Sequence, residues 1–320
     1  METSASSGDP GNSSNVEYPG NPLVILNPTA NRGNMQHYRT LIRSRIEQEH
    51  GDGEYVETTR RGEAKERAYH AAKEGRPVII VGGDGSLHEV ANGILSAGRR
   101  VPLGIVAAGS GNDFAWNTLN LPHDPAEAIE KAFTGRLVDA DAGIVNGEYF
   151  VNSFSVGIDA DIAVAAGWMK KIPLMSGQRL YYGTTVKQLL FGYQRCPWLK
   201  FSVDGNEVMD EATTMRRYVL MAVNNGPTYG AGFRINPTAV YDDGLLDICT
   251  ISYTPLSRAL KLLPVVQKGE HAALPEVTFY RAKSVHIQSK NVVNIQMDGE
   301  TTSATSYDAK ILPAALWVRV

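Results

Sequence analysis

Apolar residues in the N-terminal half of the chain form short continuous runs separated by stretches of helical spacing. The runs lie at 23–27, 55–58, 78–81 and 102–108. The third consists only of Val and Ile, as is typical of parallel strands buried on both faces. Helical spacing follows at 38–46, 62–73 and 125–133, and the last helix is expected to start at Asp124-Pro125 and to end at Gly135. This alternation predicts a parallel sheet covered by helices.

From about residue 143 the pattern changes to consecutive strand-like runs with turn signals between them. These runs lie at 149–156, 199–203, 218–223, 245–251, 277–280, 285–288 and 292–297. Only two helices are expected among them, near 180–193 and 255–266. Such a succession predicts an antiparallel, β-rich second domain.

Composition narrows the class of protein. The chain has 320 residues, 43% hydrophobic and 20% charged, with a net charge of −3. This is an ordinary globular composition, and the charge argues against a nucleic-acid partner. Two cysteines cannot form a disulfide scaffold. No apolar run reaches the length of a membrane span, and residues 1–20, rich in Ser, Gly and Asn, are expected to be a disordered leader without a signal peptide.

Two glycine-rich turns follow neighbouring predicted strands. The sequence Gly82-Gly83-Asp84-Gly85-Ser86 comes directly after the Val/Ile run. A strand, a glycine turn and a helix N-terminus together form an anion site, and the Asp84 carboxylate suggests that the anion arrives with a cation. Ser86 is expected to cap the helix, with Glu89 completing a capping box.

The second turn, Gly109-Ser110-Gly111-Asn112-Asp113, follows the next strand. One such turn could be a plain strand–helix connection, but two of them at the carboxyl edge of a sheet indicate a ligand site. The chain lacks a P-loop and the loops of protein kinases. Phosphates are therefore expected to bind to these two turns.

The ordered set of motifs resembles the catalytic domain of the diacylglycerol kinase and sphingosine kinase superfamily, most of all its soluble bacterial lipid kinases. The motifs are Asn27-Pro28-Thr29-Ala30-Asn31, the two glycine turns, Tyr229-Gly230-Ala231-Gly232-Phe233, Asp242-Asp243-Gly244-Leu245-Leu246-Asp247 and Met297-Asp298-Gly299-Glu300. The resemblance implies an α/β nucleotide-binding domain of NAD-kinase type at 21–143, to which residues 306–320 return. It also implies a β-rich lipid-substrate domain at 144–305.

The resemblance also implies roles for individual residues. Glu300 would be the general base that takes the proton from the lipid hydroxyl, and Asp84 and Asp298 would help to hold a catalytic Mg²⁺. His88 stands where the family usually has Asn, and it is expected to be an ordinary polar residue of the first helical turn. The residues expected near ATP are Asn27, Thr58, Gly82, Gly83, Asp84, Gly85, Ser86 and Ser110.

The acidic segment 242–247 has two interpretations. Taken alone, it is a β-turn in which Asp is favoured beside Gly. The resemblance implies a second, structural metal, bound by the Asp243 carboxylate and by the carbonyls of Val240 and Leu245, with Asp141 in support.

The sequence thus predicts an ATP- and Mg²⁺-dependent kinase that phosphorylates diacylglycerol or a related lipid. We expect it to be cytoplasmic and in peripheral contact with the inner face of the membrane. The sequence leaves open whether it forms a homodimer. Segment 167–174, with Trp beside Lys, is either membrane-facing or packed in the core. The alternatives are a soluble small-molecule kinase of NAD-kinase type and an inactive lipid-binding paralogue.

Overall fold

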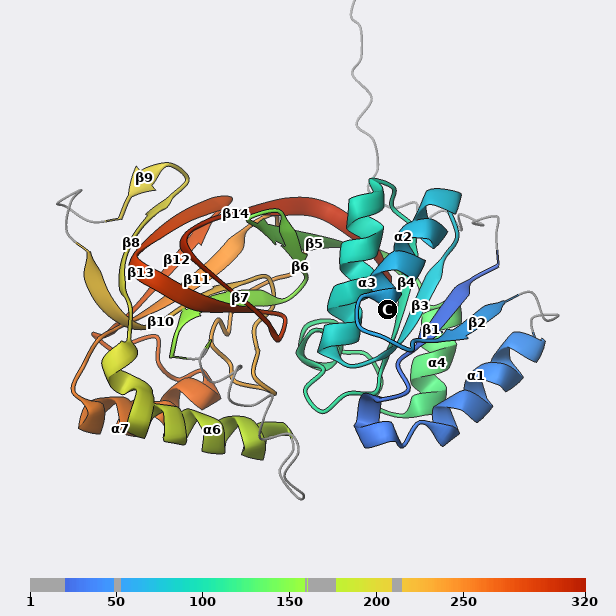
Figure 1. Ribbon diagram of the computed structural model, residues 1–320, viewed down its shortest axis with the longest axis horizontal. Helices are drawn as coiled ribbons and strands as arrows, with labels where there is room; N and C mark the ends of the chain where they lie inside the picture. The colour runs from blue at the N-terminus through green and yellow to red at the C-terminus, as the bar shows by residue number, and fades with distance from the viewer. Residues whose placement is uncertain (1–20, 49–52, 159, 161–176, 209–214) are drawn as a thin grey trace, which may run out of the picture.

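The computed structural model describes residues 21–48, 53–158, 160, 177–208 and 215–320. Figure 1 shows two halves side by side. In the N-terminal half, helices pack around a short sheet, whereas the C-terminal half consists mostly of strands with two helices along one side. A single 14-stranded sheet runs through both halves, and its main path is β12-β11-β10-β7-β13-β14-β4-β3-β1-β2.

The N-terminal half has four parallel strands in the order β2-β1-β3-β4. Every residue of β1, β3 and β4 is buried, so both faces of the sheet must be covered. Helices α1 and α4 cover one face, and α2 and α3 cover the other. The elements are β1 (Leu23–Leu26), η1 (Ala30–Gly33), α1 (Gln36–Gln48), β2 (Glu54–Glu57), α2 (Glu63–Glu74), β3 (Val78–Gly82), α3 (Asp84–Ala97), β4 (Pro102–Ala107), η2 (Asp113–Thr118) and α4 (Pro125–Thr134).

The C-terminal half is an antiparallel arrangement with an apolar core on each face. Helices α6 and α7 cover one of these faces. The elements are β5 (Leu137–Val145), β6 (Glu148–Phe150), β7 (Ser153–Gly157), α6 (Gly177–Gly192), η3 (Tyr193–Arg195), β8 (Trp198–Val203), β9 (Asn206–Glu207), β10 (Arg216–Asn224), β11 (Leu246–Ser252), α7 (Leu256–Lys268), β12 (Val277–Ala282), β13 (Ser284–Met297) and β14 (Glu300–Arg319). The predicted fold class, an α/β part followed by a strand-rich part, is confirmed.

Strand β14 joins the two halves. Its first part pairs with β13, from Met297↔Glu300 onward, whereas Trp317 and Val318 near its end pair in parallel with β4. It also pairs with β5 along much of its length. The strand therefore begins in the C-terminal half, at its turn with β13, and ends inside the N-terminal sheet (Figure 1).

Two strand predictions were wrong in detail. The run at 149–156 is divided between β6 and β7, because the backbone N–H groups of Val151, Asn152 and Ser153 bind the Asp298 carboxylate. The two runs at 285–288 and 292–297 are one strand, β13, with a register shift between Gln288 and Val293. Residues 1–20 and 167–174 lie outside the described residues. No helix in the described part of the chain is long and apolar enough to cross a bilayer.

Candidate active site

A cleft of about 980 Å³ lies where the two halves meet. It is bounded by the two glycine turns, by the loop between β2 and α2, and by the turn between β13 and β14. This volume is in the range of sites for small ligands and cofactors. Most of the residues predicted to bind nucleotide line it, namely Asn27, Thr58, Gly83, Asp84, Gly85, Ser86 and Ser110. Gly82, the last residue of β3, lies directly before them.

Helix α3 begins earlier than the sequence indicated. Its N-cap is Gly83, so Asp84 is already helical and Ser86 lies inside the first turn. The prediction of a Ser86–Glu89 capping box was wrong because tertiary contacts engage both side chains. The Asn27 amide donates a hydrogen bond to Ser86 Oγ (2.8 Å), and Glu89 accepts one from the Gly62 N–H (2.9 Å).

The two glycine turns touch each other. A Cβ on Gly109 would lie 2.6 Å from the Gly83 Cα, so neither turn has room for a side chain there. Asn112 connects the turns, because its backbone N–H donates to Asp84 Oδ2 (2.8 Å) while its side chain binds the backbone of Gly109. The cradle is therefore held in shape without a ligand.

Asp84 has the electrostatic character of a cation ligand. Burial, together with the nearby Asp113 carboxylate and then that of Asp298, raises the pKa of Asp84 to about 7. A cation bound to Asp84 would offset this repulsion, and Mg²⁺ prefers carboxylate oxygens. Asp84 therefore fits the predicted metal, although the described residues contain no cluster of three or more His, Cys, Asp or Glu side chains that could hold one.

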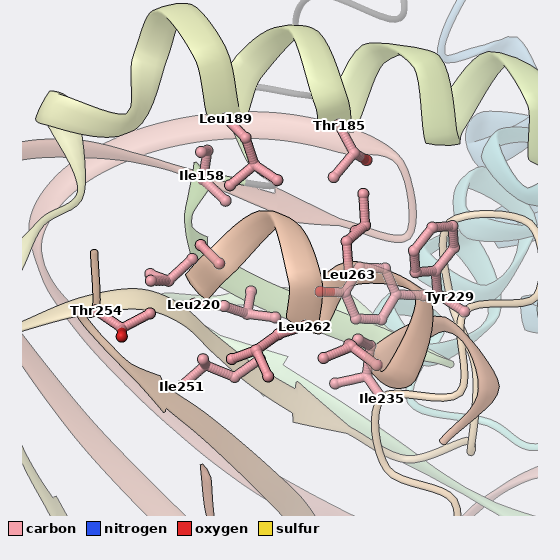
Figure 2. A pocket seen from close by; sticks show the side chains of 14 residues that line it. Ile158, Thr185, Leu189, Leu220, Tyr229, Ile235, Ile251, Thr254, Leu262 and Leu263 are labelled. Carbon is pink, nitrogen blue, oxygen red and sulfur yellow. The ribbon is translucent and has the colours of Figure 1, made fainter. Parts of the chain in front are cut away.

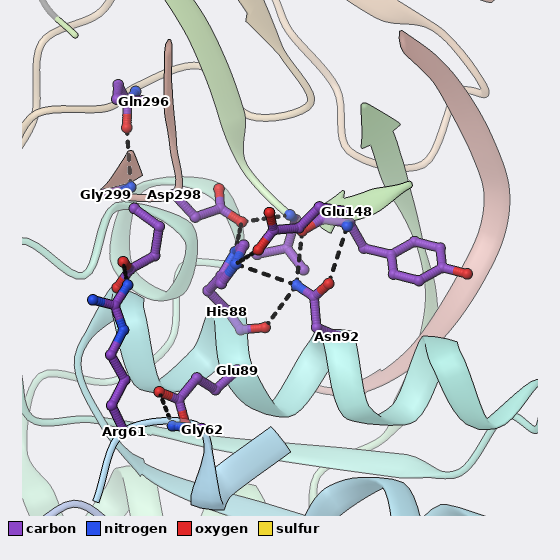
Figure 3. A network of polar contacts seen from close by, with 12 residues as sticks. Arg61, Gly62, His88, Glu89, Asn92, Glu148, Gln296, Asp298 and Gly299 are labelled. Carbon is purple, nitrogen blue, oxygen red and sulfur yellow. Dashed lines mark hydrogen bonds and ion pairs between the residues drawn. The ribbon is translucent and has the colours of Figure 1, made fainter. Parts of the chain in front are cut away.

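Asp298 lines the cleft and is held by protein groups. Its carboxylate is buried and accepts hydrogen bonds from the N–H groups of Val151, Asn152 and Ser153 at 2.8–3.1 Å. His88 contacts the same carboxylate at 3.4 Å (Figure 3). These contacts show that Asp298 shapes the turn, and its part in holding Mg²⁺ stays a prediction.

His88 itself is buried, contrary to the expectation of an ordinary polar residue. Its Nε2 lies 3.3 Å from Glu148, and its Nδ1 faces Asp298. Burial alone would lower the pKa of His88, but the two carboxylates outweigh it and raise the pKa to about 9. The protonated ring therefore bridges α3 and the strands of the C-terminal half.

Glu300 reaches the glycine turn from the opposite side of the cleft. It follows a two-residue turn, Asp298-Gly299, in which both residues have positive φ, 46° and 91°. A Cβ on Gly85 would lie 3.5 Å from Glu300 Oε1, which places this carboxylate against the turn. Arg61, in the loop between β2 and α2, pairs with Glu300 (Figure 3). Sequence reasoning missed Arg61, because a charge in an irregular loop belongs to no periodic pattern.

The acidic segment 242–247 is stabilised by protein contacts. Asp243 accepts a hydrogen bond from the Leu245 N–H (3.0 Å) and pairs with Arg281, which also lies 3.3 Å from Asp247. Asp141 accepts from the Gly244 N–H (2.7 Å), so it does contact this loop as expected. The Arg281 guanidinium supplies a positive charge at this loop, and the second metal with Val240 and Leu245 stays a prediction.

An apolar cavity lies in the C-terminal half, between helices α6 and α7 and the sheet. Figure 2 shows Leu189 of α6 facing Leu220 of β10 and Leu263 of α7 across it. Apart from two threonines and Tyr229, its lining consists of Ile, Leu, Val, Ala and Phe. Its volume of about 70 Å³ has room for a short stretch of hydrocarbon chain.

Asp113 connects this cavity to the cleft, a role that sequence reasoning missed. It is buried at the end of the second glycine turn and accepts hydrogen bonds from Thr228 Oγ1 and from the N–H groups of Ala231 and Gly232, at 2.7–2.9 Å. The flanking residues Tyr229 and Phe233 line the cavity. One short segment thus separates the glycine turns from the apolar cavity.

Comparisons with known proteins agree with this geometry. A model of the diacylglycerol kinase catalytic domain matches residues 21–145, and a model of the YegS C-terminal NAD kinase beta sandwich-like domain matches residues 152–320. Together these matches define a kinase built from an N-terminal catalytic domain and a strand-rich C-terminal domain. The chain belongs to the diacylglycerol kinase family that these two domains characterise.

Individual relatives cover most of the chain. A diacylglycerol kinase of Staphylococcus aureus (strain MRSA252) is 29% identical over 286 residues, which is 87% of this chain and 85% of the relative. That of Staphylococcus carnosus (strain TM300) is 27% identical over 284 residues, 87% of each. The crystal structure of a diacylglycerol kinase from Bacillus anthracis str. Sterne has a TM-score of 0.71 at 22% identity, covering 93% of this chain and 96% of that one. At this identity the structural likeness establishes the fold.

Proposed function

We propose that this protein transfers the γ-phosphate of ATP to the hydroxyl of diacylglycerol or a related lipid, with Mg²⁺. The observation that carries the proposal is the position of Glu300, whose carboxylate stands against the glycine turn at Gly85. Phosphoryl transfer requires a phosphate cradle, a cation and a group that orients the attacking hydroxyl. The two glycine turns, Asp84 and Glu300 supply these functions in one cleft.

In the proposed reaction, the N–H groups at the start of α3 and the side chains of Asn27, Ser86, Ser110 and Thr58 bind the nucleotide. Asp84 holds the Mg²⁺, which neutralises phosphate charge when it is bound. Glu300 accepts the proton of the lipid hydroxyl as the oxygen attacks the γ-phosphorus, and the bond to the β-phosphate oxygen breaks. Asp298 and His88 fix the turn that carries Glu300.

The apolar cavity supports a lipid as the acceptor. It lies one short segment away from the second glycine turn, at Tyr229 and Phe233. We propose that it takes part of an acyl chain while the hydroxyl lies in the cleft. A lipid acceptor further implies peripheral contact with the inner face of the membrane from the cytoplasm.

The test is a phosphorylation assay with purified protein, labelled ATP, Mg²⁺ and mixed micelles that contain a panel of lipids. We expect label in the lipid, with diacylglycerol among the best acceptors. NAD is included in the panel as a soluble acceptor, and labelled NADP in place of labelled lipid would favour the NAD-kinase alternative. Absence of label from every acceptor, in protein that binds both ATP and lipid, would favour the inactive paralogue.

A further inference from the structure

We infer that Arg61 is a phosphate-binding residue that exchanges partners. In the structure its guanidinium pairs with Glu300. When ATP binds, the guanidinium moves to the β- and γ-phosphates and leaves the Glu300 carboxylate free. This inference rests on the proposed function, and it adds a residue that no motif of the chain indicates.

The location of the ion pair is the first argument. Glu300 Oε1 would lie 3.5 Å from a Cβ on Gly85, so the carboxylate borders the turn that is proposed to bind phosphate. Arg61 reaches this carboxylate from the loop between β2 and α2, on the opposite wall of the cleft (Figure 3). Its guanidinium is therefore already beside the phosphate cradle.

The charges that line the cleft are the second argument. Among the described residues of its lining, the acidic ones are Asp84, Glu89, Asp298 and Glu300, and the cationic ones are Arg32, Arg60 and Arg61. A triphosphate needs positive charge beyond one Mg²⁺. Neither glycine turn contains Lys or Arg.

The neighbouring arginine has a different partner. Arg60 binds Glu66 of α2 with two nitrogens on two oxygens, one of the contacts at 3.1 Å. This fork-like geometry is the strong form of a guanidinium–carboxylate pair. Arg60 therefore contacts the helix that follows it, α2, whereas Arg61 pairs with Glu300 across the cleft.

The exchange costs little energy. The Arg61 side chain is 78% exposed and that of Glu300 is 31% exposed, and pairs this accessible contribute little because water already solvates both charges. Guanidinium contacts with phosphate are charge-assisted and frequently bidentate. A triphosphate in the cradle therefore outcompetes a single carboxylate for Arg61.

The exchange has a functional consequence. While Arg61 is paired with it, the Glu300 carboxylate is neutralised and is a poor proton acceptor. Once ATP has taken the guanidinium, the carboxylate is free to accept the hydroxyl proton. Glu300 thus becomes a better proton acceptor when the phosphoryl donor is in place.

The decisive experiment measures nucleotide binding by calorimetry in the E300Q background, where the carboxylate charge is already absent. In the E300Q background, R61A can weaken ATP binding only by removing a contact between Arg61 and the nucleotide. We expect E300Q/R61A to raise the Kd for Mg·ATP roughly 10- to 100-fold over E300Q, the range for hydrogen bonds to charged groups. AMP, which lacks the β- and γ-phosphates, is expected to bind both proteins within about twofold.

Arg60 supplies the matched control, because E300Q/R60A removes an equal charge from the adjacent position. It is expected to bind Mg·ATP within about twofold of E300Q, because Arg60 contacts Glu66 of α2 and not the carboxylate beside the glycine turn. Equal Mg·ATP affinity of E300Q/R61A and E300Q would overturn the inference, as would equal losses from R61A and R60A. If neither the wild type nor E300Q binds Mg·ATP, the proposed function itself fails and this inference fails with it.

The same proteins test the exchange of partners. Breaking the Arg61–Glu300 pair opposes ATP binding only when both residues are present. We therefore compare the gain in ATP affinity that E300Q causes in two backgrounds. The gain should be about two- to fivefold larger in the protein that has Arg61 than in R61A, since exposed pairs contribute up to about 1 kcal/mol. Equal effects of E300Q in the two backgrounds would show that no pair is broken when ATP binds.

Discussion

The imidazole Nδ1 of His88 lies 3.4 Å from Oδ2 of Asp298, and this contact joins helix α3 to the turn that presents Glu300. One helical turn further along α3, the Asn92 amide makes two hydrogen bonds to the backbone of Tyr149, at 2.8 and 3.0 Å. Asp84, His88 and Asn92 are spaced by four residues, so they share one face of the helix. The helix face that begins at the glycine turn therefore also contacts Asp298 and strand β6 of the C-terminal half.

This contact predicts a pH dependence of stability. The pKa of His88 in the folded protein, about 9, lies above the ordinary value of 6.5, so the stabilisation is complete below about pH 6.5 and is lost as the pH rises to about 9. At 1.36 kcal/mol per pKa unit it amounts to about 3 kcal/mol at most. Urea unfolding of wild type and H88N at pH 6 and pH 9.5 checks this. Wild type should lose about 3 kcal/mol more than H88N over this interval, and parallel losses would contradict the assignment.

Asp298 should be essential for stability. D298A leaves three buried N–H groups and the His88 ring without their acceptor, and breaking a buried charge contact in this way costs about 3–5 kcal/mol. The free energy of unfolding in urea measures the loss. E300A, two residues further along the same chain, is the control and should lose less than about 1 kcal/mol. A stable D298A would mean that other groups satisfy these N–H donors.

Glu300 should be essential for turnover but not for folding. E300Q keeps the shape of the side chain and cannot accept a proton, so the maximal rate should fall roughly 10²–10⁴-fold, the typical contribution of a positioned base. Lipid phosphorylation at saturating ATP measures the fall, and E270Q, at an exposed position after α7, serves as the control. A rate within about threefold of wild type would assign the proton to another acceptor.

The Asp84 carboxylate should lower the stability of the protein and yet be required for its activity. Its pKa is raised from 3.8 to about 7 by burial and by Asp113, so its contribution to stability is complete below about pH 3.8 and is lost as the pH rises through 7. At pH 8 the ionised carboxylate is fully destabilising in the absence of Mg²⁺. D84N removes this charge and should stabilise the metal-free protein by about 2–4 kcal/mol at pH 8, and much less at pH 4.

Turnover of D84N should nonetheless be lost, because the amide is a poor ligand for Mg²⁺. Thermal unfolding at the two pH values and the lipid assay, run on the same preparation, test both halves of this prediction. If D84N is active and no more stable than wild type at pH 8, the Asp84 carboxylate neither binds the cation nor destabilises the metal-free protein.

Filling the apolar cavity should change the preference for acyl chains. Ala259 of α7 lines the cavity, and A259L should lower the rate on diacylglycerols with long chains several-fold while leaving those with short chains and nucleotide binding less affected. The exposed Ala272 provides A272L as a surface control. Equal losses for long and short chains, or no loss, would place the acyl chains elsewhere.

Local signals in the sequence predicted local features well. Helix α4 starts after Asp124, whose carboxylate accepts hydrogen bonds from the N–H groups of Ala126 and Glu127, and it ends at Gly135 as expected. The Val/Ile run forms the buried strand β3, as its uninterrupted apolar pattern predicted. The two glycine turns were also predicted to lie together, and they touch through Gly83 and Gly109.

Features set by distant contacts escaped prediction. Ser86 carries the signature of a helix cap, but Asn27 engages its hydroxyl from 59 residues away. Asp298 also binds the backbone N–H groups of Val151 to Ser153, which no local pattern marks as unpaired. The Arg61–Glu300 pair joins residues 239 positions apart. Which charges meet across a cleft depends on the completed fold.

Strand β14 has a consequence for how the protein is made. In the finished sheet it lies between β13 and β4, so β4 has a free edge until β14 docks on it. During synthesis, the strands that carry the two glycine turns emerge long before β14, and unpaired strand edges readily join other chains. The N-terminal half is therefore the part most in need of protection on the ribosome, although its own strands and helices are translated first.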